Sequence, residues 1–278
     1  MRIDAPPTRA LRIAAVGEIC LDTFDPEGDA HLGGISVNFA RAAADAGAEA
    51  TVFAAVGDDA IGRDLRALLG AVGLTDAFVR LLPGASTQQR VRVSASGERI
   101  LCGFVAGVAA DYAPTDADLD AIAGSDAVAV PWSRETEAMI GRVLDACARV
   151  TTRPRLVCDV SIDSEAGDDP RAWVAPVKER FDLVFVGGKR EHLAPLTDAA
   201  RTARGLVVLT AGADGAFAIT KDGVHHAPAQ AKAIVDTLGC GDAFQGAFVA
   251  KLLAGASVDA ALTAGARAAA IVAARRGA

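Results

Sequence analysis

Short apolar runs of β type alternate with helical patterns along most of this chain. Leu11–Gly17 is typical of a buried strand, Ser36–Gly47 of a helix, and Ala50–Gly57 of the next strand. Further strands are expected at 126–131, 155–160, 182–187 and 206–210. Strands separated by helices form parallel sheets that are covered on both faces. The sequence therefore predicts one α/β domain over residues 1–278, with a doubly wound, mostly parallel sheet and helices on both faces.

Two segments interrupt this alternation. The stretch that begins at Ser86 alternates polar and apolar residues around a Ser96-Gly97 turn, which predicts a β-hairpin. The early segment LDTFDPEGDAHLGG is too polar for a core and is expected to pair with that hairpin. Together, about 21–34 and 86–106 would form a small β-lid. A second hairpin is expected over Ala216–Ala229.

Composition limits the classes of partner. The chain has 278 residues, 51% of them hydrophobic, and a net charge of -7, which argues against a general nucleic-acid binder. A nucleotide ligand remains compatible with that charge, because a local anion site needs only a few well-aimed donors. Five scattered cysteines without a CxxC pair indicate a reducing cytoplasm. No apolar run reaches the length of a membrane span, so no membrane partner is expected.

Several common catalytic motifs are absent from the sequence. It has no GxxxxGK[ST], no GxGxxG after the first strand, no GxSxG and no HExxH. The four histidines show no metal-ligand spacing. These absences argue against a P-loop enzyme, a dinucleotide fold, an α/β-hydrolase and a zinc protease.

The segment DTLGCGD, from Asp236 to Asp242, lies between a strand-like stretch and a helix. Its glycines let the backbone approach a ligand, and amides at a helix N-terminus favour an anion such as phosphate. A carboxylate at Asp242 can accept a proton from a hydroxyl while the amides hold phosphoryl charge. Those are the two requirements of phosphoryl transfer to an alcohol. The alternative is that Asp242 only caps the helix.

Polar residues and glycines also follow earlier strands. Ligands of open α/β sheets bind outside the carboxyl ends of the strands, so these residues are expected to gather there. They are Asp22, Gly33, Gly34 and Asn38. Asp and Asn side chains offer acceptors and donors to a polyhydroxy ligand, although Asn38 alone is equally typical of a polar contact within the fold.

The loop LTAGADG follows a late strand. Thr210, Gly212 and Gly215 would allow the close approach of a nucleotide phosphate or ribose. A plain turn into the second hairpin is the alternative interpretation.

In this order and spacing, the motifs resemble those of the ribokinase-like (PfkB) carbohydrate kinases. The resemblance runs from Leu11 to about Gly277 and rests on the early Asp, GG-x(3)-N, VGDDxxG, the lid hairpin, LTAGADG and DTLGCGD. It implies a ribokinase-like fold with a small β-lid. It also implies transfer of the γ-phosphate of ATP, with Mg²⁺ bound, to a hydroxyl of a sugar or sugar derivative.

The resemblance implies a role for each motif residue. Asp242 would be the catalytic base, and the amides of Gly239, Cys240 and Gly241 would form the anion hole. The sugar would be held by Asp22, Gly33, Gly34 and Asn38, and the nucleotide by Thr210, Gly212, Gly215, Asp236 and Thr237. Asp236 resembles the residue that helps to hold a monovalent cation, such as K⁺, in some members. Cys240 stands where the family often has Ala, and a thiol beside an anion hole is expected to be sensitive to oxidation.

One stretch departs from the family pattern. Many members carry Asn-x-x-Glu after the strand that corresponds to 182–187, and the motif helps to organise the metal and phosphates. Here the stretch reads GGKREHL. Glu191 is a candidate metal ligand out of register, and Lys189 and Arg190 are candidates for direct contact with phosphate.

Substrate choice is expected to depend on the lid. Gln88 and Arg90 share one face of the hairpin and would present donors to a polar or anionic substituent if that face looks inward. Solvated side chains at the lid rim are the alternative.

GVAADY, CDVS and DTLGCGD resemble the fructoselysine 6-kinase branch of the family, which implies a fructosamine phosphorylated on its 6-hydroxyl. An unmodified sugar, a sugar acid or a nucleoside stays open as substrate, and so does a non-catalytic regulator that binds sugar or nucleotide. Relatives often pair through the lid, whose outer strand would otherwise be an exposed edge, so a homodimer is expected.

Overall fold

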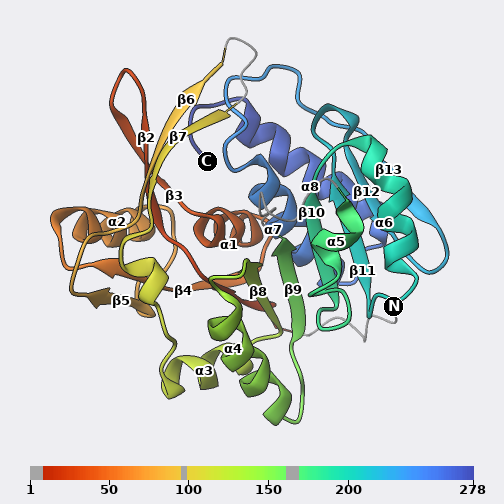
Figure 1. Ribbon diagram of the computed structural model, residues 1–278, viewed down its shortest axis with the longest axis horizontal. Helices are drawn as coiled ribbons and strands as arrows, with labels where there is room; N and C mark the ends of the chain where they lie inside the picture. Colours follow the sequence, from red (N-terminus) through yellow and green to blue (C-terminus); the bar gives the residue numbers. More distant parts are fainter. Residues whose placement is uncertain (1–8, 95–98, 161–168) are drawn as a thin grey trace.

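A nine-stranded sheet forms the centre of the molecule (Figure 1). The computed structural model describes residues 9–94, 99–160 and 169–278. The strand order is β13-β12-β11-β10-β9-β8-β1-β4-β5, and all neighbours are parallel except at β12 and β13. The strands are β1 (Arg12–Val16), β4 (Glu49–Gly57), β5 (Val79–Leu82), β8 (Ala127–Trp132), β9 (Arg155–Val160), β10 (Leu183–Gly187), β11 (Leu206–Thr210), β12 (Ala216–Ile219) and β13 (Val224–Ala227).

Helices cover both faces of this sheet. Successive strand residues point to opposite faces, so Ile13 and Ala15 enter one core while Ala14 and Val16 enter the other. The first core packs under α1 (Ile35–Asp45), α2 (Ala60–Ala71), α7 (Cys240–Leu253) and α8 (Val258–Ala273). The second packs under α3 (Asp116–Ala123), α4 (Glu137–Arg149), α5 (Pro170–Val174) and α6 (Leu193–Ala200). Short 3₁₀ turns lie at η1 (Gly107–Asp111), η3 (Arg190–His192) and η4 (Gly212–Asp214).

A second, four-stranded sheet rises from one side of the body (Figure 1). This small sheet has the order β3-β2-β6-β7. Its strands are β2 (Cys20–Phe24), β3 (Asp29–Gly33), β6 (Gln88–Val93) and β7 (Arg99–Val105). The early polar segment therefore pairs with the first hairpin, as the sequence predicts. The predicted Ser96-Gly97 turn lies outside the described residues.

The mostly parallel, doubly wound architecture confirms the predicted fold class. Asp59 caps α2 by accepting the Gly62 amide at 2.7 Å, and Gly47 takes a left-handed φ of 101° after α1. The sequence did not predict β5, a four-residue edge strand without a clear apolar alternation. In the described ranges, no helix is both long and apolar enough to cross a bilayer.

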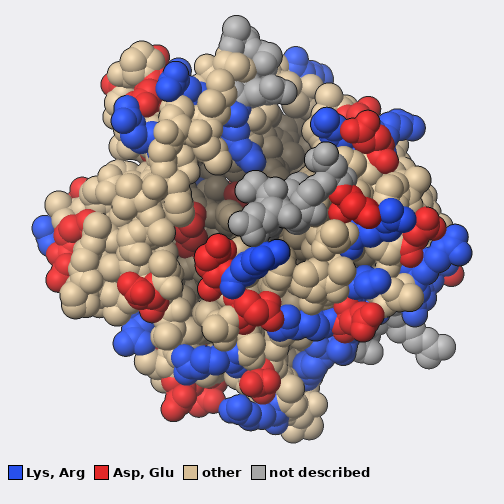
Figure 2. Space-filling model, viewed as in Figure 1, with Lys and Arg blue, Asp and Glu red and all other residues tan. Residues whose placement is uncertain are grey.

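The topology places a crevice beside β1. In the sheet, β1 has β4 on one side and β8 on the other, so the chain first adds strands on one side of β1 and later on the opposite side. Such a switch point opens a crevice outside the carboxyl ends of the strands. The small sheet begins just after β1 and borders this crevice, where Figure 2 shows the surface hollowed between the small sheet and the body.

Candidate active site

The N-terminus of α7 is built by glycine. Gly239 caps the helix with a left-handed φ of 74°, and a Cβ at this position would overlap the side chain of Ala278. Cys240, Gly241 and Asp242 then form the first turn. Amides of a first turn have no intrahelical acceptor, and the helix dipole is positive at this end. The Cys240 amide donates to the Thr237 carbonyl at 3.3 Å, so the amides of Gly241 and Asp242 are the first-turn donors that fit the predicted anion hole.

The space next to this turn is open. A Cβ on Gly241 would meet no protein atom within 4 Å. Packing within the protein thus does not require a glycine at this position. The absent side chain leaves room for a ligand at the first turn of α7, at the residue before Asp242.

Asp242 is held by a side chain from α1. Its Oδ2 accepts a hydrogen bond from Nδ2 of Asn38 at 3.0 Å, and Asn38 is only 7% exposed. Burial raises the pKa of Asp242, while the bond from Asn38 and the charge of Arg99 act in the opposite direction. A carboxylate with a raised pKa is a stronger base for a hydroxyl proton. Asn38 therefore binds the candidate base directly. Its predicted contact with the sugar stays a prediction.

Two glycines shape the backbone around Asp22. The Asp22 side chain on β2 is buried, and a Cβ on Gly33 would overlap its Oδ2 atom. Gly34 has a φ of 102°, and its Cβ would lie 2.6 Å from the Glu18 carbonyl oxygen. Both glycines are thus required by the protein itself: Gly33 makes room for the Asp22 carboxylate, and Gly34 allows the close approach of the Glu18 backbone.

Asp236 and Thr237 fix the loop that precedes α7. Asp236 is 1% exposed, and its two oxygens accept the amides of Leu238 and Gly277, each at 2.9 Å. The Thr237 hydroxyl accepts the Arg99 amide at 3.2 Å, and its carbonyl accepts Nη1 of Arg99 at 3.4 Å. Asp236 therefore ties the loop to the end of the chain, and Thr237 joins it to the small sheet.

Sequence reasoning missed two carboxylates of the crevice. The pKa of Glu18, Asp22 and Asp159 is raised to about 7 in each case, chiefly by burial and to a smaller extent by the charge of Asp242. Gln245, one turn along α7, donates to Asp159. A signal was available: Glu18 directly follows the first strand, and Asp159 is a charged residue inside an apolar strand.

The predicted nucleotide residues lie at the carboxyl end of β11. The Thr210 hydroxyl donates to the Val186 carbonyl at 3.4 Å. Gly212 has a φ of 55° and open space where its side chain would be. A Cβ on Gly215 would instead overlap the carbonyl oxygen of Ala227, so the hairpin packing requires this glycine. Gly212 is the position of the three that leaves room for a ligand.

The small sheet turns a different face inward than expected. Asp22 pairs with Gln89 in the strand register, and paired residues share a face. Gln89 and Val91 are buried, whereas Arg90 is exposed and forms an ion pair with Asp25 at 2.8 Å. Gln88 and Arg90 therefore lie on the face that points away from Asp22, since apolar and neutral residues of β6 cover the body. Arg90 is therefore a solvated side chain at the rim of the small sheet, which was the alternative interpretation of the sequence.

Glu191 is exposed on η3. Its side chain is 70% accessible and lies 3.7 Å from the ammonium of Lys189. Across the described ranges, no three His, Cys, Asp or Glu side chains cluster closely enough to hold a metal ion. A Mg²⁺ ion commonly takes one or two carboxylates and completes its shell with substrate phosphates and water. The described residues fit a Mg²⁺ site of this kind, in which the protein supplies one or two carboxylates and does not surround the ion with its own ligands.

Cys240 differs from its expected reactivity. Burial, with a smaller contribution from Asp236, raises the pKa of its thiol to about 11. The thiolate is the form that reacts with oxidants, and with a pKa this high little thiolate is present at neutral pH. The raised pKa argues against the expected sensitivity to oxidation.

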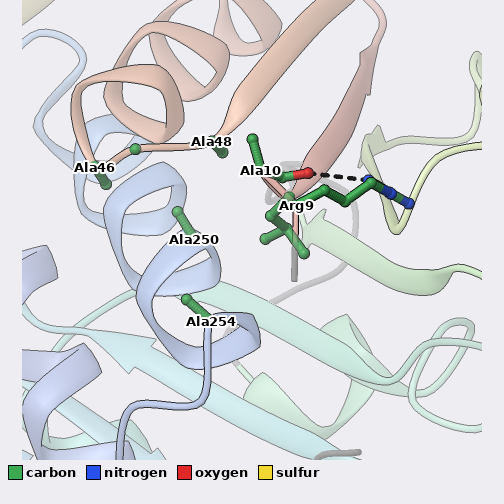
Figure 3. Close-up of a pocket in the computed structure, with 8 residues that line it drawn as sticks. Arg9, Ala10, Ala46, Ala48, Ala250 and Ala254 are labelled. Carbon is green, nitrogen blue, oxygen red and sulfur yellow. Dashed lines mark hydrogen bonds between the residues drawn. The ribbon is translucent and has the colours of Figure 1, made fainter. Parts of the chain in front are cut away.

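Another cavity, of about 150 Å³, lies at the opposite end of the sheet. It is lined by the segment just before β1, the turn after α1 and the C-terminal end of α7, with the alanines shown in Figure 3. Arg9 is its charged residue and pairs with Asp126 at 2.8 Å. The cavity offers little chemistry, and the crevice beside α7 is the candidate active site.

The model of the pfkB family of carbohydrate kinases matches residues 25–278. The chain belongs to this family. It is 27% identical to a fructoselysine 6-kinase from Shigella flexneri over 257 residues, which cover 91% of this chain and 94% of the relative. It is 29% identical to a 2-dehydro-3-deoxygluconokinase from Thermoproteus tenax over 266 residues, or 89% and 81% of the two chains.

The fold is shared with solved kinases. A putative ribokinase II from E. coli, solved in complex with ATP and Mg²⁺, superposes with a TM-score of 0.81 at 18% identity and covers 97% of this chain and 94% of that chain. Membership in the family makes this protein an ATP-dependent carbohydrate kinase. The predicted family and class of reaction are thereby confirmed.

Proposed function

We propose that Asp242 is the base of this kinase and that the acceptor hydroxyl binds in the open space beside Gly241. The observation that supports this most is the position of Asp242, which lies in the first turn of α7 with one oxygen bound to Asn38. Asp242 would take the hydroxyl proton while the acceptor oxygen forms a bond to the γ-phosphorus. The bond between that phosphorus and the bridging oxygen of ADP breaks in the same transfer.

The first-turn amides of α7 would hold the charge of the transferring group. Donors preorganised in a site that excludes water stabilise charge that develops in the transition state. Mg²⁺ would neutralise phosphate charge and orient the transfer. Glu191 is the candidate side chain toward the metal, and ATP phosphates would supply most of the ligands. Thr210 and Gly212 would border the nucleotide.

Closure of the small sheet over the crevice would exclude water, as expected of a β-lid. Water competes with the sugar hydroxyl for the phosphoryl group. Asp22 and Gln89 would then face the acceptor from the small sheet. Asp236 would hold the loop in place and would also be the contact for a monovalent cation such as K⁺.

A fructosamine such as fructoselysine, phosphorylated on its 6-hydroxyl, is the substrate that we favour. Two observations support it: the relative named fructoselysine 6-kinase, and the buried carboxyls of Glu18, Asp22 and Asp159 around the crevice. A fructosamine carries an amine that is protonated at neutral pH, and carboxylates stabilise such a cation. A sugar acid is the second candidate, because of the relative that acts on 2-dehydro-3-deoxygluconate by name.

A panel assay tests the substrate class. ADP release would be measured with ATP and Mg²⁺ against fructoselysine, other fructosamines, ribose, fructose, sugar acids and nucleosides. We expect the highest kcat/KM with a fructosamine. A higher value with a sugar acid or a nucleoside would overturn this assignment while leaving the kinase intact. If no compound in the panel caused ADP release while the protein still bound ATP, a regulator that binds without catalysis would be favoured.

The small sheet is also the proposed interface of a homodimer. β7 is an edge strand, and its outer residues Ile100 and Val105 are 51% and 50% exposed. An exposed apolar edge is prone to pair with another chain.

The five cysteines are free thiols, which suits a protein that works with ATP in the reducing cytoplasm.

A further inference from the structure

Arg99, the first residue of β7, shares the inner face of the small sheet. It pairs with Val93 in the antiparallel register, and Val93 lies on the same face of β6 as Val91 and Gln89. Asp22 belongs to this face as well, through its pairing with Gln89. The Arg99 side chain therefore starts on the side of the sheet that faces the crevice.

Arg99 is also bound to the loop that precedes α7. Its amide donates to the Thr237 hydroxyl at 3.2 Å and its Nη1 atom to the Thr237 carbonyl at 3.4 Å. Thr237 is separated from Gly239, the cap of α7, by one residue. These two bonds connect the small sheet directly to the loop where phosphate is expected.

Several carboxyl groups surround Asp242 in the crevice. Asp242 is faced by Glu18 from the segment after β1, Asp22 from β2, Asp159 from β9 and the neutral Asn38 from α1. The charge of Arg99 lowers the pKa of Asp242, Asp22 and Asp159 against the effect of burial. Arg99 is exposed, so solvent screens part of this effect.

We propose that Arg99 is a positioning residue for phosphoryl transfer, which supplies from the small sheet the positive charge that keeps the base ionised when the crevice closes. The inference rests on the proposed role of Asp242. Closing the small sheet removes water from several carboxylates at once, and dehydration favours their protonated forms. Thr237 lies in the loop that precedes α7 and holds Arg99 there. The positive charge of Arg99 would therefore act on the Asp242 carboxylate when the small sheet closes.

The experiment compares Arg99→Gln, Arg99→Lys and Arg92→Gln. Arg92 is an exposed arginine on the outer face of the same hairpin, so Arg92→Gln is the matched control for loss of one charge. The kcat/KM of each variant would be measured from pH 5 to 9 with the best acceptor of the panel. In Arg99→Gln the acidic limb should move to higher pH, with a loss on the order of tenfold at pH 6 that shrinks as pH rises. Arg99→Lys and Arg92→Gln should retain the wild-type profile.

A second readout does not need turnover. The carboxyl resonances of protein labelled with ¹³C at aspartate would be titrated in wild type and in the three variants. Asp242 should titrate at higher pH in Arg99→Gln alone. An unchanged titration in Arg99→Gln, or an equal loss of activity at every pH in Arg99→Gln and Arg99→Lys, would overturn the proposal. A shifted titration together with full activity of Asp242→Asn would uphold the effect of Arg99 on the Asp242 carboxyl and reject the proposed role of Asp242 as the base.

Discussion

At the scale of single residues, Gly33 is the position where the site tolerates least change. A Cβ there would overlap the Asp22 carboxylate, which is buried and has little room to move. Gly33→Ala should therefore lower stability by about 1–3 kcal/mol, the usual cost of overpacking, and reduce kcat/KM for the sugar. Denaturant unfolding and steady-state kinetics measure both effects.

Gly70→Ala is the matched control for that change. Gly70 lies within α2, and a Cβ there would meet nothing within 4 Å. Alanine in a helix interior is favoured over glycine by up to about 1 kcal/mol, so stability should stay equal or rise. Equal behaviour of the two variants would show that Asp22 is not confined by Gly33.

Glu18 should make stability depend on pH. Its pKa is raised to about 7 by burial, so the folded state binds the proton more tightly than the unfolded chain. The stability that this proton provides is fully present below about pH 4 and is lost as pH rises through about 7. Glu18→Gln should therefore raise Tm at pH 8 and raise it by much less at pH 5.

The exposed Glu179 provides the control for this substitution. Glu179→Gln removes the same charge from the surface and should shift Tm little at either pH. A stabilisation by Glu18→Gln of equal size at pH 5 and pH 8 would contradict the assignment of a buried, titrating carboxyl.

At the scale of elements, local pattern predicts much of the structure. Ala50–Gly57 and its parallel neighbours are long apolar runs, and the glycine-rich segment DTLGCGD before a helical pattern already indicates the N-terminus of α7. The face of β6 was not predictable, because a one-residue difference in register reverses every side chain. The hairpin shifts register between Arg90 and Val91, and no local signal in the sequence marks that shift.

The edge of the small sheet should determine the oligomeric state. If β7 pairs with a second copy, Ile100→Glu places a charge in that apolar contact and should convert a dimer to a monomer. Light scattering after size exclusion measures the mass. Val224→Glu on β13, another exposed apolar residue at a sheet edge, should leave the dimer intact. A monomeric wild type would contradict the interface.

At the scale of the whole molecule, the site depends on contacts that no local pattern contains. Asn38 and Asp242 are 204 residues apart and share one hydrogen bond, while Arg99 reaches Thr237 across 138 residues. The order of the motifs indicated that Asp22, Asn38 and Asp242 would meet. It gave no reason to expect Arg99, because an arginine beside a hairpin turn is usually solvated.

The whole site should bind Mg²⁺ through ATP. Over the described ranges no cluster of three metal-binding side chains exists, and Mg²⁺ bound with few protein ligands relies on phosphate oxygens. Calorimetry should therefore detect little Mg²⁺ binding by the free protein and clear binding once ATP is present, and EDTA should abolish turnover. Tight binding of Mg²⁺ without ATP would contradict this arrangement.

The most direct test of the account follows the phosphoryl group itself. Wild type and Asp242→Asn would be incubated with the best acceptor and ATP carrying ³²P at the γ-position, and labelled sugar would be measured alongside ATP binding. We predict rapid transfer by wild type, and a loss of at least about 10²-fold in Asp242→Asn with ATP affinity largely retained. Comparable transfer by both proteins would contradict the assignment of Asp242 as the base.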